Sequence, residues 1–68
     1  MLKIFGFNLK IERIKNKLSQ EELALKVGFS KPYISNVECA KHNISLINAY
    51  KLSESLNKSL DEMLKEQI

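Results

Sequence analysis

The feature that most constrains the fold of this chain is the spacing of four small or apolar residues in its middle third. Two short helices that cross at about 90–120° need a small side chain at their contact, and Ala24 supplies one. Gly28 favours the positive φ of a tight turn at low steric cost. Ile34 and Val37 provide apolar anchors on the inner face of the second helix. The spacing therefore predicts two short crossing helices that are joined at Gly28.

Serine residues mark the expected starts of four helices. Ser19 and Ser59 are each followed three residues later by a glutamate, which is the pattern of a capping box. Ser30 precedes Pro32, which is tolerated in a first helical turn, and Ser45 precedes an apolar residue that can begin a helix. With these starts, the sequence predicts helices over residues 3–16, 20–27, 31–40, 46–56 and 60–66.

Apolar residues recur at helical spacing, and no stretch shows the period of two that a half-buried strand needs. Helices this short do not persist alone in water, so they must share one apolar core. We therefore expect a single all-α domain over residues 1–68. Its expected core consists of Phe5, Leu9, Leu18, Leu23, Ala24, Val27, Ile34, Val37, Leu46, Ala49, Leu52, Leu56, Leu60 and Leu64.

Positive charge gathers at one end of the chain, whose net charge is +3. Residues 1–20 contain five basic side chains against a single acid, Glu12, and residues 21–45 are neutral overall. Residues 46–68 hold one more acidic than basic side chain. A basic end of this kind suits a domain that turns one face toward phosphates.

Several classes of protein are disfavoured by what the chain lacks. It has one histidine, no Gly-rich phosphate loop, no pattern of a paired-carboxylate pocket and too little chain to enclose a substrate, so we do not expect an enzyme. Cys39 and His42 lie close in sequence, but two ligands do not close a zinc site, so we expect neither a metal nor a cofactor. A lone thiol, the absence of a signal-like segment and the absence of a long apolar run favour a cytoplasmic protein without membrane contact.

The second of the two crossing helices has an outer face that is polar and poor in acid. This face carries Lys31, Pro32, Ser35, Asn36 and Cys39. Short polar side chains beside a long cation fit a DNA major groove and can hydrogen-bond to base edges. The one acid of this helix, Glu38, points inward at helical spacing, so it does not repel phosphates. The pattern favours a DNA-reading surface.

Three runs of sequence together resemble phage repressor and Cro-like proteins, the xenobiotic-response-element family. The helix-turn-helix of the family is matched by LSQEELALKVGFSKPYISNVE, its first helix by FGFNLKIER and its last two helices by SLINAYKLSESLNKSLDEML. The resemblance extends over nearly the whole chain. It implies a compact five-helix, lambda-repressor-like domain that regulates transcription by binding a palindromic DNA operator as a homodimer.

Within this family, the segment KPYISNVECAKHNIS is similar to controller proteins of restriction–modification systems. This resemblance implies a small dimeric regulator of a restriction–modification operon. The alternative is an antitoxin or other protein-interaction module that binds a partner protein and autoregulates its operon. The partner proteins that these two possibilities imply are RNA polymerase and a toxin, respectively. The resemblance does not distinguish an activator from a repressor.

The resemblance also implies roles for individual residues. The base-contacting residues would be Lys31, Pro32, Ser35 and Asn36. The phosphate-contacting residues would be Gln20, Ser30, Tyr33, Lys41, His42 and Asn43. Arg13 would pair with Glu38 and tie the first helix to the recognition helix. The dimer interface would include Leu56, Met63 and Leu64.

Four positions depart from the pattern of the family, and one of them is Lys58, which replaces a common valine. Ala40 stands where a glycine commonly ends the recognition helix. Alanine at positive φ costs roughly 1 kcal/mol, so we expect this helix to end differently. Lys17 stands where glycine is frequent, so we expect Asn16 to adopt the left-handed conformation instead. Glu12 occupies a position that is usually apolar and inward.

The first predicted helix is apolar on two sides. Phe5 and Leu9 lie on one face, whereas Phe7, Ile11 and Ile14 lie on nearly the opposite face. A helix of this kind is either buried twice or offers one side to a partner. We expect the second face to be covered by the fifth helix and the N-terminal residues, or to join the dimer interface.

Overall fold

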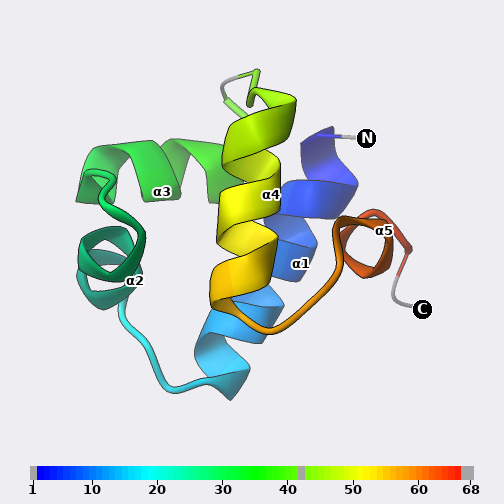
Figure 1. Ribbon diagram of the computed structural model, residues 1–68. Helices are drawn as coiled ribbons and strands as arrows, with labels where there is room; N and C mark the ends of the chain where they lie inside the picture. Colours follow the sequence, from blue (N-terminus) through cyan, green and yellow to red (C-terminus); the bar gives the residue numbers. More distant parts are fainter. Residues whose placement is uncertain (1, 42, 67–68) are drawn as a thin grey trace.

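The computed structural model describes residues 2–41 and 43–66, and within them the chain forms five helices (Figure 1). These are α1 (Leu2–Lys15), α2 (Gln20–Val27), α3 (Lys31–Glu38), α4 (Leu46–Ser55) and α5 (Leu60–Met63). The all-α prediction is confirmed, and α2 has the predicted bounds. Among the described residues, no helix is long and apolar enough to cross a bilayer.

Both predicted capping boxes are present. The Ser19 hydroxyl accepts a hydrogen bond from the Glu22 N–H at 3.0 Å, and the Glu22 carboxylate accepts one from the Ser19 N–H at 2.8 Å. Ser59 and Glu62 repeat this exchange at 3.0 and 2.9 Å. The serines before α3 and α4 also accept a hydrogen bond from the third residue of their helices. The four predicted starts are therefore confirmed, and each satisfies a helical N–H that would otherwise lack a partner.

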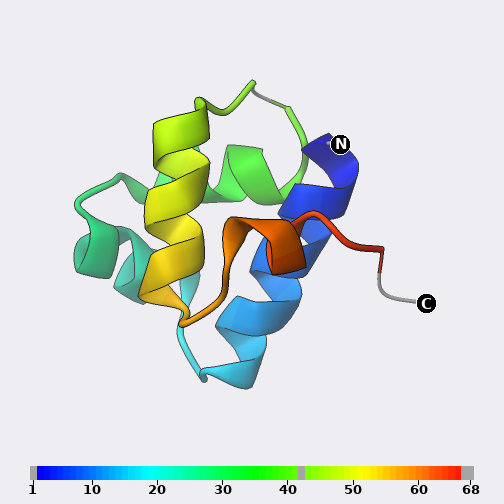
Figure 2. The same cartoon turned by 45° about the vertical axis from the view of Figure 1, so that its right-hand side comes forward.

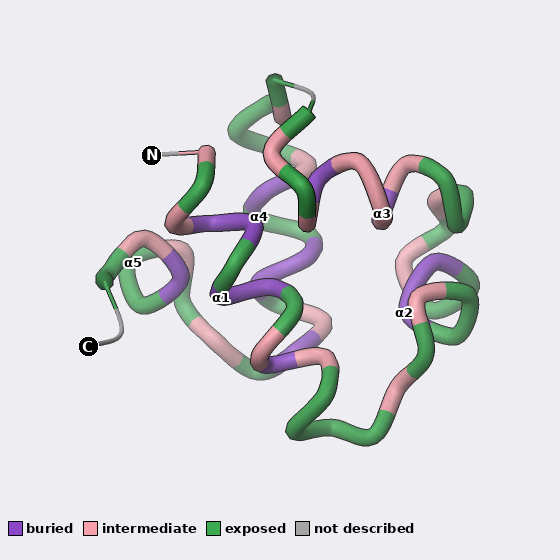
Figure 3. Tube along the Cα trace, turned by 180° about the vertical axis from the view of Figure 1, so that it is seen from behind, coloured by how far each residue is buried: buried purple, intermediate pink, exposed green. Residues whose placement is uncertain are grey.

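Two helices form a central pair, and the other three lie on either side of this pair. In Figures 1 and 2, α1 and α4 lie in the middle, with α2 and α3 on one side and α5 on the other. The buried positions of the Cα trace face the space between these elements (Figure 3). The buried apolar side chains are Phe5, Leu9, Leu23, Ala24, Ile34, Val37, Ala49, Leu52, Leu56 and Met63. Every helix thus contributes to one core.

Some expected core residues lie at its edge or outside it. Leu46 is 74% exposed, so its assignment to the core is wrong. It is the first residue of α4, and Ala49 and Leu52 fill the inner face of that helix instead. The partly buried residues that pack against the core include Leu18, Val27, Leu60 and Leu64.

The burial of α4 and α5 also corrects the expected dimer interface. Leu56 and Met63 are buried inside the protomer, so neither side chain is available to a second copy. Met63 was missing from the expected core and occupies the inner position of the short helix α5. Of the three expected interface residues, only Leu64 is partly exposed.

Two expectations about helix ends are wrong. Helix α3 ends at Glu38, and Ala40, two residues later, has a φ of 56°, the left-handed conformation for which glycine is the usual choice. Lys17, with a φ of 58°, takes the left-handed conformation that we expected at Asn16. The Asn16 side chain instead donates a hydrogen bond to the Glu12 carbonyl oxygen at 2.7 Å. Glu12 is buried, as the inward position predicts.

Helix α5 ends three residues before its predicted end, at Met63. The buried side chain of Asn8, on α1, donates from Nδ2 to the carbonyl oxygens of Met63 at 2.7 Å and Lys65 at 2.8 Å. These carbonyls would otherwise need helical or solvent partners. A side chain from a distant part of the sequence therefore caps the end of α5.

Candidate nucleic-acid interface

The crossing of α2 and α3 places the candidate DNA-reading helix. Gly28 has a φ of 80°, and the Phe29 N–H closes the turn by donating to the Ala24 carbonyl oxygen at 2.8 Å. A Cβ at Gly28 would meet nothing within 4 Å, so the glycine is needed for its backbone conformation alone. Ala24 lies buried at the helix contact, as do the apolar anchors Ile34 and Val37 of α3. The helix–turn–helix predicted from these four residues is confirmed.

The outer side of α3 carries the residues expected to contact bases. Lys31 and Pro32 are exposed, and Ser35 and Asn36 are partly exposed. We call these four residues the recognition face. The structure brings them together on one side of a single helix, while Ile34 and Val37 point into the core. Their contact with DNA stays a prediction.

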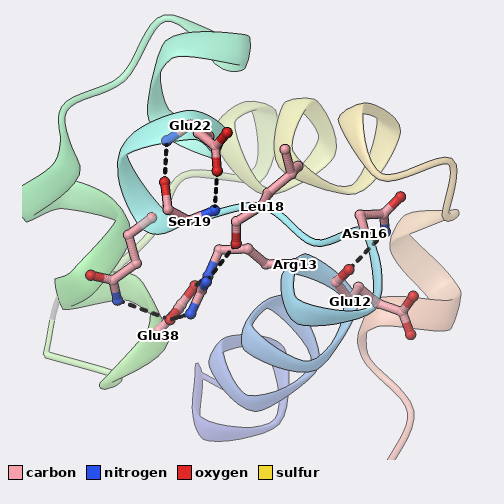
Figure 4. A network of polar contacts seen from close by, with 8 residues as sticks. Glu12, Arg13, Asn16, Leu18, Ser19, Glu22 and Glu38 are labelled. Atoms are coloured by element: carbon pink, nitrogen blue, oxygen red, sulfur yellow. Dashed lines mark hydrogen bonds and ion pairs between the residues drawn. The ribbon is translucent and has the colours of Figure 1, made fainter.

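Glu38 lies at the end of α3, and its side chain points toward Arg13 of α1 (Figure 4). Its carboxylate accepts hydrogen bonds from Arg13 Nε at 2.6 Å, Arg13 Nη2 at 3.2 Å and Gln20 Nε2 at 3.1 Å. The side chain of Glu38 is 3% exposed, so the predicted ion pair with Arg13 is confirmed as a buried one. Arg13 Nη1 also donates to the Leu18 carbonyl oxygen at 2.8 Å. The network fixes the end of α3 against α1 and the start of α2.

Gly6 is a positioning residue that the sequence analysis missed. A Cβ at this position would collide with the carbonyl oxygen of Val37 and lie 3.0 Å from that of Glu38. Helix α1 therefore approaches the end of α3 so closely that only glycine fits. A glycine inside a helical pattern is the signal that could have indicated this contact.

Three of the expected phosphate contacts lie at the starts of α2 and α3. Gln20 begins α2 and is partly buried, because its amide donates to Glu38. Ser30 is the exposed cap of α3. The Tyr33 hydroxyl accepts a hydrogen bond from Asn48 Nδ2 at 3.1 Å, which links α3 to α4. Ser30 and Tyr33 therefore lie at the start of the recognition helix, whereas the Gln20 amide lies near its end, and each side chain also has a structural role.

The other expected phosphate contacts lie in the loop between α3 and α4. Lys41 and Asn43 are exposed there, next to the end of the recognition helix. His42 lies outside the described residues.

The ring of Tyr33 packs edge-on against Phe29, with centroids 5.1 Å apart and an interplanar angle of 66°. That contact orients Tyr33 relative to the turn between α2 and α3.

The capping boxes shift the acidity of their glutamates. The Ser19 backbone N–H donates to the Glu22 carboxylate and is the main cause that holds the pKa of Glu22 below its ordinary value, and the Ser19 side chain lowers it further. Ser59 lowers the pKa of Glu62 in the same way. On α4, the hydrogen bond to Glu54 raises the pKa of Tyr50.

The part of the chain that the structure describes contains no group of three or more His, Cys, Asp or Glu residues that could hold a metal ion.

Comparison with known proteins agrees with this geometry. The family model described as "Helix-turn-helix" matches residues 9–63. Control protein C.MunI from Mycoplasma sp is 36% identical over 63 residues, which cover 91% of this chain and 85% of the relative. The solved restriction–modification controller protein C.AhdI from Aeromonas hydrophila is 37% identical with a TM-score of 0.85, covering 91% of this chain and 94% of that chain.

A further solved relative is C.Esp1396I, a restriction–modification controller protein described as a tetramer in complex with its natural 35 base-pair operator. It is 29% identical to this chain with a TM-score of 0.82, covering 93% of this chain and 87% of that chain. The matched family model spans most of the chain, including both crossing helices and the core around them. The chain belongs to the helix-turn-helix family of DNA-binding transcription regulators, and not to a class of enzymes.

Proposed function

We propose that two copies of this chain bind an operator of inverted half-sites, each with its recognition face in the major groove. The observation that carries this proposal is the inward turn of Glu38, which leaves the outer side of α3 without a carboxylate. Asn36 can pair with adenine through two hydrogen bonds, and Lys31 can donate to the acceptors of guanine. Pro32 and Ser35 are close enough along the helix to contact the neighbouring bases.

Several of the proposed phosphate-contacting side chains have hydrogen-bond donors that their contacts within the protein do not use. These donors support the proposed phosphate contacts. Gln20 has two amide hydrogens, and its hydrogen bond to Glu38 uses one of them. The hydroxyls of Ser30 and Tyr33 act as acceptors within the protein, so each can donate its own hydrogen to a phosphate. Lys41 and Asn43 add donors from the following loop. Together these groups can set the register of the protein on DNA without reading sequence.

The dimer is supported by apolar side chains at the start of α4. Leu46, Ile47 and Tyr50 are exposed there, and we call these three residues the α4 patch. Beside the patch lies a hollow of about 250 Å³ lined by Leu2, Phe5, Ile44, Leu46, Ala49, Leu60 and Leu64. Apolar surface of this extent favours burial against a second copy. A two-fold dimer would place two recognition helices about 34 Å apart, one turn of DNA.

We further propose that the regulated gene belongs to a restriction–modification operon. The support is that C.MunI and C.AhdI are named control or controller proteins and match nearly the whole chain. The operator complex of C.Esp1396I supports assembly of more than one dimer on a long site. An antitoxin remains the alternative function, and the binding experiment separates the two.

The test is selection of binding sites from random duplex DNA, followed by affinity measurement across salt concentrations. We expect at least one inverted repeat with half-site centres about 10 base pairs apart. Affinity should fall steeply with salt, because each neutralised phosphate releases counterions. An antitoxin-like protein would instead bind a partner protein tightly, with a flat salt response and no selected DNA site. That result would contradict the proposal.

Two variants separate base reading from phosphate binding. Asn36→Ala should cost about 1–3 kcal/mol of binding free energy and relax the preference at one base position. Lys41→Ala should weaken binding to all sequences and reduce the salt slope by about 1. An unchanged base preference in Asn36→Ala would remove Asn36 from the base-contacting set.

A further inference from the structure

The outer face of α1 carries an apolar stripe that the rest of the protomer leaves partly uncovered. We call it the α1 stripe: Ile4, Phe7, Ile11 and Ile14. Phe7 is 51% exposed and Ile14 is 52% exposed, while Ile4 and Ile11 are partly buried. The expectation that α5 and the N-terminal residues cover this face is therefore wrong for its two exposed members. A regulator that reads DNA through α3 has no evident use for this face.

The spacing of the α1 stripe is that of a helix-pairing seam. Positions 4, 7, 11 and 14 alternate by three and four residues, as the a and d positions of a coiled coil do. The seam is narrow and lies opposite Phe5 and Leu9, which fill the protein core from the other side of α1. Such a narrow seam suits one partner helix, whereas an apolar face that lies on a membrane is broader.

Lysines flank the seam on both sides. In the same heptad frame, Lys3 and Lys10 occupy g positions and Lys15 occupies an e position, and all three are exposed. No described residue forms an ion pair with Lys3 or Lys10, and Lys15 lies 3.5 Å from the buried carboxylate of Glu12. Two copies of this chain paired along the seam would bring lysines against lysines in either orientation. The flanks therefore disfavour a second copy and favour an acidic partner.

A hollow beside the seam offers room for an entering side chain. It has a volume of about 250 Å³ and is lined by Lys3, Ile4, Phe7, Asn8 and Glu66. This volume is below the range of pockets for drug-sized ligands, about 300–1000 Å³, but it admits a protein side chain. Asn8 uses Nδ2 to cap α5, and its buried Oδ1 has no hydrogen-bond partner among the described residues. The hollow thus combines apolar contact from Ile4 and Phe7 with one positive side chain, Lys3, one negative side chain, Glu66, and an unused acceptor.

We propose that the α1 stripe is a docking surface for an acidic amphipathic helix of another protein. The apolar residues of that helix would pack on Phe7 and Ile14, and its glutamates or aspartates would face Lys3, Lys10 and Lys15. This surface is separate from the recognition face and from the α4 patch, so the docked helix and DNA can be bound together. The proposal does not depend on the identity of the operator or on the dimer.

The test uses the full-length chain and synthetic heptad peptides. The main probe has leucine at a and d and glutamate at e and g over about three heptads. A matched peptide with lysine at e and g tests the charge, and vesicles of anionic phospholipid test a membrane. Binding is measured by fluorescence anisotropy of the labelled peptides and by sedimentation with the vesicles. We expect the acidic peptide to bind at least about tenfold more tightly than the basic one.

Variants locate the bound peptide. Phe7→Ser and Ile14→Ser should each weaken it about tenfold or more, because each removes a large apolar contact. Lys10→Glu should weaken the acidic peptide and strengthen the basic one. Leu25→Ser, at an exposed leucine on α2, is the matched control and should leave binding unchanged. Thermal unfolding of each variant is measured first, to show that the variant is folded. If a serine variant does not fold, Lys10→Glu, a change at an exposed residue, still tests the proposal.

Four outcomes would overturn the proposal. The basic peptide could bind as tightly as the acidic one, or Leu25→Ser could weaken binding as much as Phe7→Ser. Binding to the vesicles that Phe7→Ser abolishes, without binding of the peptide, would assign the surface to a membrane instead. Operator affinity is measured in parallel. If Lys10→Glu lowers operator affinity and leaves peptide binding unchanged, the flanking lysines contact DNA phosphates instead of a partner helix.

Discussion

Glu38 shows how one buried side chain can support the proposed DNA-reading surface from inside the protein. A carboxylate that is 3% exposed needs a charge partner and filled hydrogen-bond positions, and Arg13 and Gln20 supply both. Because the same contacts hold the carboxylate against Arg13 and Gln20, they keep a negative charge off the side of α3 that is proposed to face phosphates. The residue thus couples the packing of α3 to its electrostatics.

Removing the partner of Glu38 should be costly. We expect Arg13→Met to lower the free energy of unfolding by about 3 kcal/mol, the low end for an uncompensated buried charge, because Arg13 is 12% exposed. Urea unfolding monitored by circular dichroism measures the change. Lys65→Met breaks an exposed pair with Asp61 and should cost less than about 1 kcal/mol. Equal losses in the two variants would contradict the buried-charge explanation.

Ala40 and Gly28 both have left-handed backbone, so a glycine at position 40 should stabilise the protein and an alanine at position 28 should destabilise it. Ala40→Gly should raise the free energy of unfolding by about 0.5–1 kcal/mol, because relief of strain at a φ of 56° exceeds the added entropy of the unfolded chain. Gly28→Ala should lower it by about 1 kcal/mol through backbone strain alone, since the added Cβ meets open space. Thermal unfolding compares both with the parent. A loss of stability in Ala40→Gly would show that the strain is absent.

At the scale of elements, the helix starts follow from local chemistry and some helix ends do not. Each serine cap needs only residues within one turn, so Ser19 and Ser59 identify their helices from sequence. The end of α5 is set by Asn8, which lies on α1 and is far away in sequence. The close contact at Gly6 likewise depends on where the end of α3 lies. Local patterns contain no information about these partners.

The capping box of α2 predicts a dependence of stability on pH. The pKa of Glu22 is lowered from 4.5 by Ser19, so its contribution is present above about pH 4.5 and is lost as the pH falls through the lower folded value. Glu22→Gln keeps the hydrogen bond and removes the titration. The melting temperature of the parent should therefore exceed that of the variant at pH 7, and the difference should shrink toward pH 3. Glu21→Gln, which removes a carboxylate from the same turn without touching the box, is the control.

At the scale of the whole molecule, the protomer leaves two apolar surfaces with different surroundings. The α4 patch adjoins a hollow lined by apolar side chains, whereas the α1 stripe is bordered by lysines. Tyr50 of the α4 patch binds Glu54, and Lys51 is exposed beside it, so both signs of charge border this patch and two identical copies can meet there. Charges of one sign, as along the α1 stripe, oppose such a contact. The two surfaces therefore suit a second copy and an acidic partner, respectively.

The dimer proposal predicts that stability depends on protein concentration. A folded dimer gains stability by mass action, so the melting temperature should rise as concentration increases. Leu46→Lys should abolish this rise and give a folded monomer in sedimentation, because it places a charge in the α4 patch. Leu25→Lys makes the same change at an exposed leucine of α2 and should leave the dimer intact. A concentration dependence that persists in Leu46→Lys would place the dimer interface elsewhere.

The sequence by itself determined the features that depend on neighbours within a few residues. The serine caps, the left-handed turn at Gly28 and the inner face of Ile34 and Val37 identify the helix–turn–helix, because each is set by local sterics and hydrogen bonds. Arg13 and Glu38 were paired by resemblance to a family, and the structure explains the pair by burial.

Tertiary structure decided the features that depend on what lies opposite in space. Leu46 and Met63 have similar apolar character, yet Leu46 is exposed and Met63 is buried, because the docking of α5 onto α1 and α4 determines which side of each helix is covered. Ala40 keeps a strained backbone because the end of α3 is held by Gly6 and by the ion pair at Glu38. Burial is a property of the whole packing arrangement, so periodicity along the chain cannot assign it residue by residue.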